Sequence, residues 1–125
     1  MNIVDSSGWL EYFANTKIAG FFAKAIENTG ELIVPTIIIT EVFKKILVEK
    51  DENDALYAIA QMMQGKVAEL SVNIAINAAK FGKELKLPLA DSIIYATARF
   101  YDASIYTQDS DFKGLEKVFF IKKNN

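Results

Sequence analysis

Short apolar runs alternate along the chain with longer segments whose apolar residues recur at helical spacing. The short runs have the length of β-strands, and the longer segments have the 3.6-residue period of amphipathic helices. The expected strands cover residues 2–4, 32–34, 67–70, 104–106 and 118–121. Helices are expected over about residues 7–28, 36–49, 51–64, 71–85 and 89–101, with a short helical turn before the last strand. This alternation predicts an α/β fold, in which helices flank both faces of a mainly parallel sheet of about five short strands.

Length and composition fit one folded unit. The chain has 125 residues, of which 51% are hydrophobic, and this is enough apolar material for one core. Because the sequence contains no internal repeat and no linker rich in proline, glycine or serine, we expect a single domain over residues 1–125. The chain does not begin with a basic segment followed by an apolar run, and no stretch stays apolar for the roughly 18 residues of a membrane span. We therefore expect a cytoplasmic protein with no membrane partner.

The sequence contains neither histidine nor cysteine. Their absence excludes Ser-His-Asp and Cys-His catalysis, disulfides and the usual zinc sites. Catalysis would then depend on carboxylates, hydroxyls and lysines, and a bound metal would be a hard cation such as Mg²⁺ or Mn²⁺. The net charge of −2 provides no global field for nucleic acid, and Arg99 is the only arginine. A nucleic-acid partner must therefore be inferred from local features.

Two aspartates follow expected strands. Asp5 comes directly after the first, and Asp109 lies three residues beyond the strand over 104–106. Ligands of open parallel sheets bind at the carboxyl ends of the strands, so the two acids could meet although about a hundred residues separate them. Each could equally cap the helix that follows it.

A third aspartate, Asp91, shares a helix face with the apolar Ile94 and Ala98, while the polar side of that helix carries Ser92 and Arg99. An acid on an apolar face is not an ordinary solvated residue, and it would need a cationic partner or a proton. A structural aspartate stabilised by the helix dipole is the alternative.

A fourth acid, Glu41, lies on the helix expected over 36–49, and the main apolar stripe of that helix points away from it. An ordinary surface glutamate would give the same pattern. However, Ile37 and Val48 share its side of the helix, which indicates a second packed face.

Four short segments around these acids resemble the successive motifs of PIN domains: residues 4–7 (VDSS), 40–42 (TEV), 89–92 (LADS) and 106–112 (YTQDSDF). Each is short and nonspecific alone, but the four occur in order along essentially the whole chain. The likeness is greatest to the compact VapC-type toxins of toxin–antitoxin pairs.

The resemblance implies a parallel sheet and hydrolysis of RNA phosphodiester bonds with Mg²⁺ or Mn²⁺. It also implies a cluster of Asp5, Glu41, Asp91 and Asp109, with Asp111 as an outer ligand and with Ser7 and Thr107 orienting the carboxylates or nearby water. The fourth motif varies across the family, so it leaves open whether Asp109, Asp111 or both reach the metal. A homodimer is implied, as is an antitoxin whose C-terminal segment covers the acids, with an arginine in place of the metal charge.

These residues suggest a division of roles. Asp5, Asp91 and Asp109 would hold the metal directly or through water, while Glu41 would orient or deprotonate the attacking water. The sequence leaves the number of ions open.

RNA would be bound by lysines near the acids. The candidates are Lys44 and Lys45, one turn beyond Glu41, and the group of Lys80, Lys83 and Lys86, for each of which a solvated helix face is the alternative. The aromatic residues Trp9, Tyr12 and Phe13 have helical spacing, which favours a core or subunit contact over base stacking.

Other α/β classes fit less well. A phosphate-accepting receiver domain has a paired acid after its first strand, whereas this chain has only Asp5 there. A haloacid dehalogenase phosphatase needs a second aspartate at the position of Ser7. A PIN-like module that binds RNA or protein without turnover remains the non-enzymatic alternative.

Overall fold

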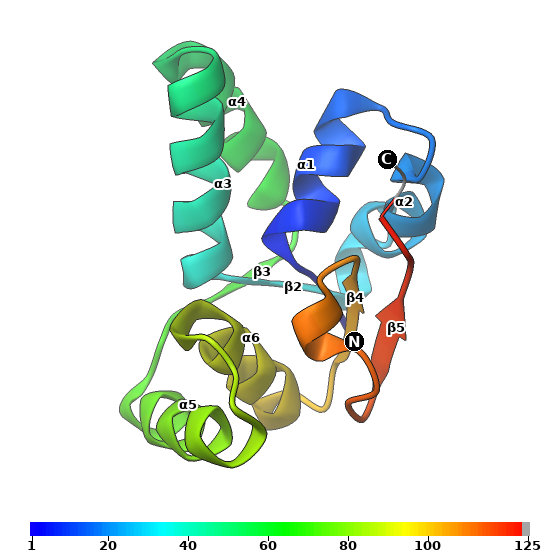
Figure 1. Ribbon diagram of the computed structural model, residues 1–125. Coiled ribbons are helices and arrows are strands. Elements are labelled where there is room, and N and C mark those ends of the chain that lie inside the picture. Colours follow the sequence, from blue (N-terminus) through cyan, green and yellow to red (C-terminus); the bar gives the residue numbers. More distant parts are fainter. Residues whose placement is uncertain (124–125) are drawn as a thin grey trace.

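A five-stranded sheet with order β3-β2-β1-β4-β5 forms the centre of the computed structural model, which describes residues 1–123 (Figure 1). Every strand pairing is parallel, so the predicted α/β class is confirmed. The third strand ends two residues earlier than expected, because Glu69 and Leu70 are exposed and lie outside the ladder. The strands are β1 (Asn2–Val4), β2 (Leu32–Pro35), β3 (Lys66–Ala68), β4 (Ser104–Thr107) and β5 (Val118–Phe120).

Six α-helices and two short 3-10 turns connect the strands in the described part of the chain. The helical region expected over 7–28 is two helices, because Asn15 adopts a left-handed conformation (φ 53°) and ends the first. The fifth helix begins as predicted, since the Ser71 hydroxyl accepts the Ile74 N–H at 3.2 Å. The elements are α1 (Ser6–Ala14), α2 (Ala19–Glu27), η1 (Thr29–Glu31), α3 (Thr36–Glu49), α4 (Glu52–Met62), α5 (Val72–Leu85), α6 (Leu89–Phe100) and η2 (Ser110–Phe112).

The direction of chain travel decides which helices cover which face. From β1 the chain moves outward to β2 and β3, and it then returns across the sheet to β4 and β5. Because crossovers between parallel strands are right-handed, reversing the direction of travel moves the connecting helices to the other face. Accordingly, α1 and α2 lie on one side of the sheet, and α6, with α5 packed on it, lies on the other (Figure 1). The start of α1 and the start of α6 therefore approach the central strands from opposite faces.

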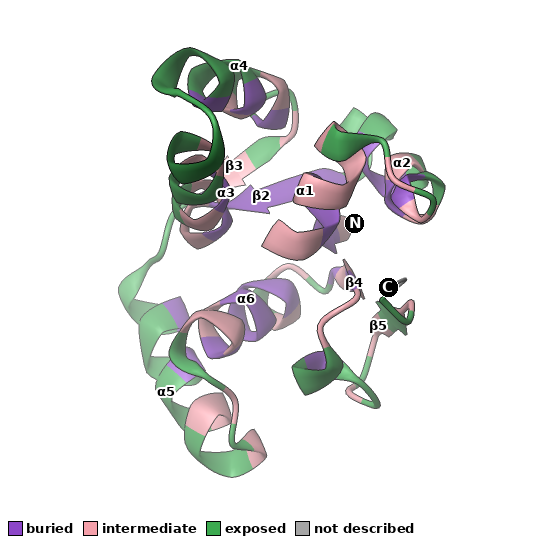
Figure 2. Cartoon of the chain, turned by 45° about the horizontal axis from the view of Figure 1, so that its top comes forward, coloured by how far each residue is buried: buried purple, intermediate pink, exposed green. Residues whose placement is uncertain are grey.

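The core lies between the strands and the inner sides of these helices (Figure 2). Ser92, expected on the polar side of its helix, is buried there. It tolerates burial because its hydroxyl donates to the Leu89 carbonyl oxygen at 2.7 Å. The second packed face expected on α3 is present only near its start, since Ile37 is half-buried and Val48 is 75% exposed. Among the described residues, no helix has both the length and the apolar character needed to cross a membrane.

Gly8 lets α1 approach the sheet closely. A β-carbon at this position would lie 2.6 Å from Val4 and 2.5 Å from the ring of Phe22, both of which are fully buried. Gly20, in α2, has no neighbouring atom within 4 Å of the same point.

We therefore expect Gly8→Ala to lower the free energy of unfolding by about 1–3 kcal/mol, since the added methyl group overpacks the core. The matched variant Gly20→Ala should be neutral or more stable by up to about 1 kcal/mol, because alanine favours a helix over glycine. Urea denaturation of both variants measures the difference. Equal effects would show that α1 is not held against β1 as described.

Candidate metal centre

Asp5 is the most enclosed acid of the site, with only 3% of its surface exposed. It ends β1 and caps α1, where its Oδ1 accepts the Gly8 N–H at 3.0 Å and the Ser7 hydroxyl at 2.8 Å. Its Oδ2 accepts the Thr107 hydroxyl at 2.6 Å. The capping alternative is thus correct for Asp5, and it coexists with a position close enough to Asp109 for the charge of that residue to act on Asp5.

Thr107 joins Asp5 to the loop that carries the other acids. While its hydroxyl donates to Asp5, the same oxygen accepts the backbone N–H of Asp109 at 2.8 Å. Asp109 in turn accepts the Asp111 N–H at 2.9 Å and so caps η2. These successive hydrogen bonds therefore fix the direction in which the Asp109 and Asp111 side chains leave β4.

Asp91 meets these two residues from α6. It lies in the first turn of α6, and carboxylate oxygens of Asp91, Asp109 and Asp111 all lie within 4.8 Å of one another. Asp5 is not part of this tight group, and each of its oxygens accepts a hydrogen bond. The structure thus brings Asp111 into the group as fully as Asp109.

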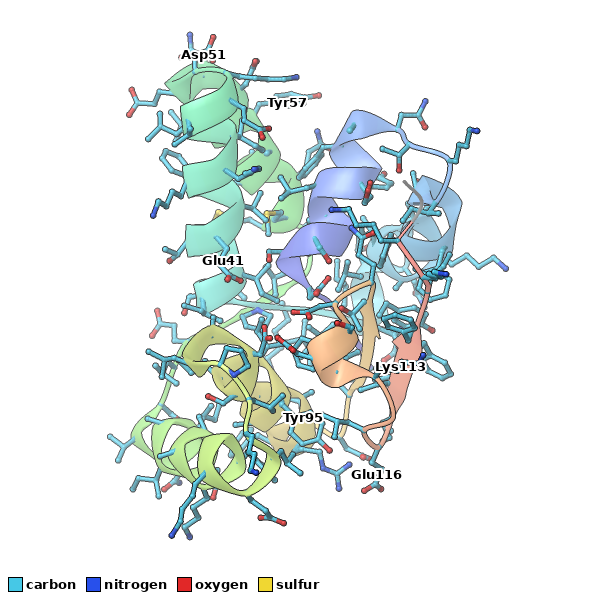
Figure 3. The ribbon with its side chains drawn as sticks, viewed as in Figure 1. Glu41, Asp51, Tyr57, Tyr95, Lys113 and Glu116 are labelled. Carbon is cyan, nitrogen blue, oxygen red and sulfur yellow. The ribbon has the colours of Figure 1, made fainter. Side chains whose placement is uncertain are left out.

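Glu41, labelled in Figure 3, lies on α3, close enough to Asp109 for the charge of that residue to act on it. Its Oε1 is buried and has no hydrogen-bond partner among the described residues, although a buried carboxylate oxygen normally has one. The hydroxyl of Ser6 lies close enough to lower the pKa of Glu41, but burial and the charge of Asp109 raise it overall. The sequence analysis did not name Ser6 as a site residue. Its position between Asp5, which caps α1, and Ser7 could have indicated that it lies in the site.

Three of the acids, Asp5, Glu41 and Asp91, have raised pKa values because they are wholly or partly buried. Burial raises the pKa of Asp5 to about 6, against the lowering effect of its hydrogen bonds from Thr107, Ser7 and Gly8. Burial, followed by the charge of Asp109 and the proximity of Asp111, raises the pKa of Asp91 to about 8. Without a cation, Asp91 therefore holds at neutral pH a proton that an isolated carboxyl group would have lost.

This donor set fits a hard divalent cation. It offers only oxygen atoms, its members repel one another, and Glu41 has an oxygen free to accept a further hydrogen bond. Asp91, Asp109 and Asp111 are the residues placed to hold an ion, with Asp5 and Glu41 beside them.

The predicted RNA-binding lysines do not contact the acids in the described part of the chain. Lys45 pairs with Glu49 at 3.0 Å, and Lys44 is exposed on the same helix. Lys80 and Lys83 are exposed on α5, the outer helix of its layer. For these lysines, the alternative that they belong to ordinary solvated helix faces therefore remains open.

An apolar hollow of the described surface lies elsewhere. It is a groove of about 290 Å³ between α1, α3 and α4, and none of the clustered acids lines it. Its apolar walls include Leu10, Phe13 and Ile46. Trp9, from the aromatic segment of α1, is 1% exposed and packs against Tyr12 and Phe13, as expected for a core residue.

The parallel sheet with carboxylates gathered at its strand ends is the arrangement of the PIN domain, and the sequence matches the PIN domain family over residues 3–118. The chain therefore belongs to the PIN domain family, a family of nucleases. No curated protein sequence matches it.

Solved structures of toxin–antitoxin proteins share the fold. The chain is similar to a protein of a toxin–antitoxin complex from Klebsiella pneumoniae, with 23% identity, a TM-score of 0.79 and coverage of 97% of this chain and 100% of the other. It is also similar to VapC20 of Mycobacterium tuberculosis, described as a toxin that cleaves the sarcin–ricin loop (15%, 0.75, 98% of each chain). A third similar structure is DNA-bound VapBC from Salmonella typhimurium (12%, 0.75, 97% and 96%).

The raised pKa of Asp91 makes the stability of the metal-free protein depend on pH. Since folding raises this pKa from 3.8 to about 8, the folded protein disfavours the charged carboxylate, and stability falls as pH rises through that range. We expect Asp91→Asn to melt several degrees above the wild type in EDTA at about pH 8, and the gap should shrink at about pH 5. Thermal melts at both pH values measure it.

Magnesium provides the second arm of the same experiment. Millimolar Mg²⁺ should stabilise the wild type more than Asp91→Asn, because a complete site couples binding to folding. If Asp91 served only its helix terminus, the substitution would be neutral or destabilising and Mg²⁺ would shift both proteins equally. That outcome would remove Asp91 from the site.

Proposed function

We propose that this PIN domain is a metal-dependent endoribonuclease that hydrolyses RNA phosphodiester bonds with Mg²⁺ or Mn²⁺ in the cytoplasm. The observation that supports it most directly is the approach of carboxylate oxygens of Asp91, Asp109 and Asp111 to within 4.8 Å of one another, from α6 and from the segment that follows β4. These three residues would hold the cation directly, and Asp5 would act from beside them, directly or through water. Three carboxylates this close repel one another in the metal-free protein. Such repulsion is expected at a functional site whose active form contains a bound cation.

The chemistry divides between the cation and the side chains. When bound, a divalent cation neutralises carboxylates, polarises a phosphate oxygen and acidifies water, so hydrolysis does not need histidine. Glu41 would accept a hydrogen bond from the attacking water at its unpartnered Oε1 and orient or deprotonate it. Thr107 and Ser7 would keep the Asp5 carboxylate in one orientation through their bonds to its two oxygens. A PIN-like module that binds without turnover is the alternative.

Hydrolysis of labelled RNA should require Mg²⁺ or Mn²⁺, cease in EDTA, and fall by orders of magnitude in Asp5→Asn and Asp91→Asn. The matched control is Asp51→Asn, which neutralises an exposed acid that caps α4 far from the site (Figure 3). Asparagine caps a helix about as well as aspartate, so this variant should keep full activity. Cleavage that persists in EDTA or in both site variants would contradict the proposal, and stable RNA binding without cleavage would support the non-catalytic module.

We further propose that the protein is the toxin of a toxin–antitoxin pair, acting as a homodimer with a cognate antitoxin. Similarity to proteins from such complexes supports this role, and so does the apolar groove between α1, α3 and α4. The excess negative charge would also favour an antitoxin segment that inserts an arginine among the acids. Exposed apolar side chains on the neighbouring helices α3 and α4, among them Val48 (75% exposed) and Tyr57 (70%), support self-association.

Expression of the active protein should inhibit growth, and co-expression of the protein encoded beside it should relieve the inhibition. Asp91→Asn, expressed to the same level, should be harmless because it lacks hydrolysis. Light scattering of the purified protein should give the mass of a dimer. Harmless overexpression of a demonstrably active wild type would refute the toxin role and leave the nuclease proposal intact.

A further inference from the structure

Lys113 lies beside the acidic site and is absent from the set of lysines that the sequence indicates. It caps η2, the turn that carries Asp111, and its backbone N–H donates to the Ser110 carbonyl oxygen at 3.1 Å. Figure 3 shows Lys113 between η2 and β5. The same short turn thus presents an acid on one residue and a cation two residues later.

The Phe120 ring fixes where this cation stands. The Lys113 Nζ lies 5.5 Å from the centroid of that ring, a distance at which the ring face attracts an ammonium group. Phe120 is paired in register with Thr107 across β4 and β5, so the two side chains share one face of the sheet on strands about 4.8 Å apart. Since Thr107 bonds to Asp5, the Lys113–Phe120 pair stands one strand from the centre of the acidic network.

The charge of Lys113 is not neutralised by a carboxylate among the described residues. Lys45 and Arg99 each pair with a glutamate, at 3.0 and 3.6 Å, and Lys117 pairs with Asp102 at 2.8 Å. Lys113 is exposed, and its ammonium group rests on an aromatic ring instead. It therefore remains available to an external anion.

A nuclease with a net charge of −2 and an acidic centre repels RNA unless cations lie along the path of the strand. We propose that Lys113, held over Phe120, is a substrate-positioning residue that binds a backbone phosphate of RNA next to the bond that is cut. The proposal rests on the ribonuclease function proposed above. Lys113 holds the strand in place and takes no part in the chemical step, while the aromatic ring limits the freedom of its side chain.

The test is steady-state hydrolysis of a labelled single-stranded RNA in Mg²⁺ at several salt concentrations. Lys113→Gln should raise KM about five-fold at about 0.1 M salt and leave kcat unchanged, because one phosphate contact to a single strand contributes about 0.7 to the salt slope. The slope of log(kcat/KM) against log salt should fall by about that amount. Lys113→Arg should restore both values.

The matched control is Lys17→Gln, which removes the same charge from an exposed lysine in the α1–α2 connection. It should leave KM and the salt slope unchanged. If Lys113→Gln behaves like Lys17→Gln while the wild type cleaves RNA, the inference is overturned and the nuclease function stands. The inference is also overturned if Lys113→Gln lowers kcat alone, or if its only effect is weaker binding of a protein partner. A wild type that does not cleave RNA overturns both.

Discussion

The hydrogen bond between Thr107 and Asp5 joins positions 102 residues apart, and the geometry of the site depends on it. It ties the end of β4 to the end of β1, and through the same oxygen it fixes the Asp109 backbone. Both partners are buried, so an uncompensated carboxylate there would cost several kcal/mol. Removing the hydroxyl would therefore disturb the position of Asp109 as well as the charge of Asp5.

The location of the acids follows from the strand order. Between β1 and β4 the chain reverses its direction across the sheet, and at such a switch point the helices leave to opposite faces and open a crevice at the strand ends. The start of α1 and the start of α6 meet across that crevice. This arrangement lets Asp5 and Asp91, each at a helix N-terminus where negative charge is favoured, face Asp109 without a long loop.

Much of this arrangement could be predicted from the sequence, because it depends on local signals. These are the spacing of the apolar residues and the acidic residues that follow the expected strands. The strands, the helical segments and the position of Asp91 on a partly buried face follow from them. The sequence could not show that Asp111 approaches Asp91 closely, as Asp109 does. This depends on the hydrogen bonds of the Thr107 hydroxyl and of the η2 cap, which set the path of the loop. The burial of Ser92 was missed because a serine that bonds to its own helix behaves as a small apolar residue.

Lysine positions show the limit of spacing arguments most clearly. Lys44 and Lys45 share a helix with Glu41, yet Lys45 turns to Glu49, because an i,i+4 carboxylate is nearer than the site. Lys113 makes no ion pair among the described residues, although Asp109 lies four residues before it, and its ammonium group rests on Phe120, a residue brought to it by strand pairing. If cations paired with the clustered acids, they would neutralise the charge that a metal needs. Lys45 and Lys113 instead contact other groups, and the negative charge of the acids remains available to a divalent ion.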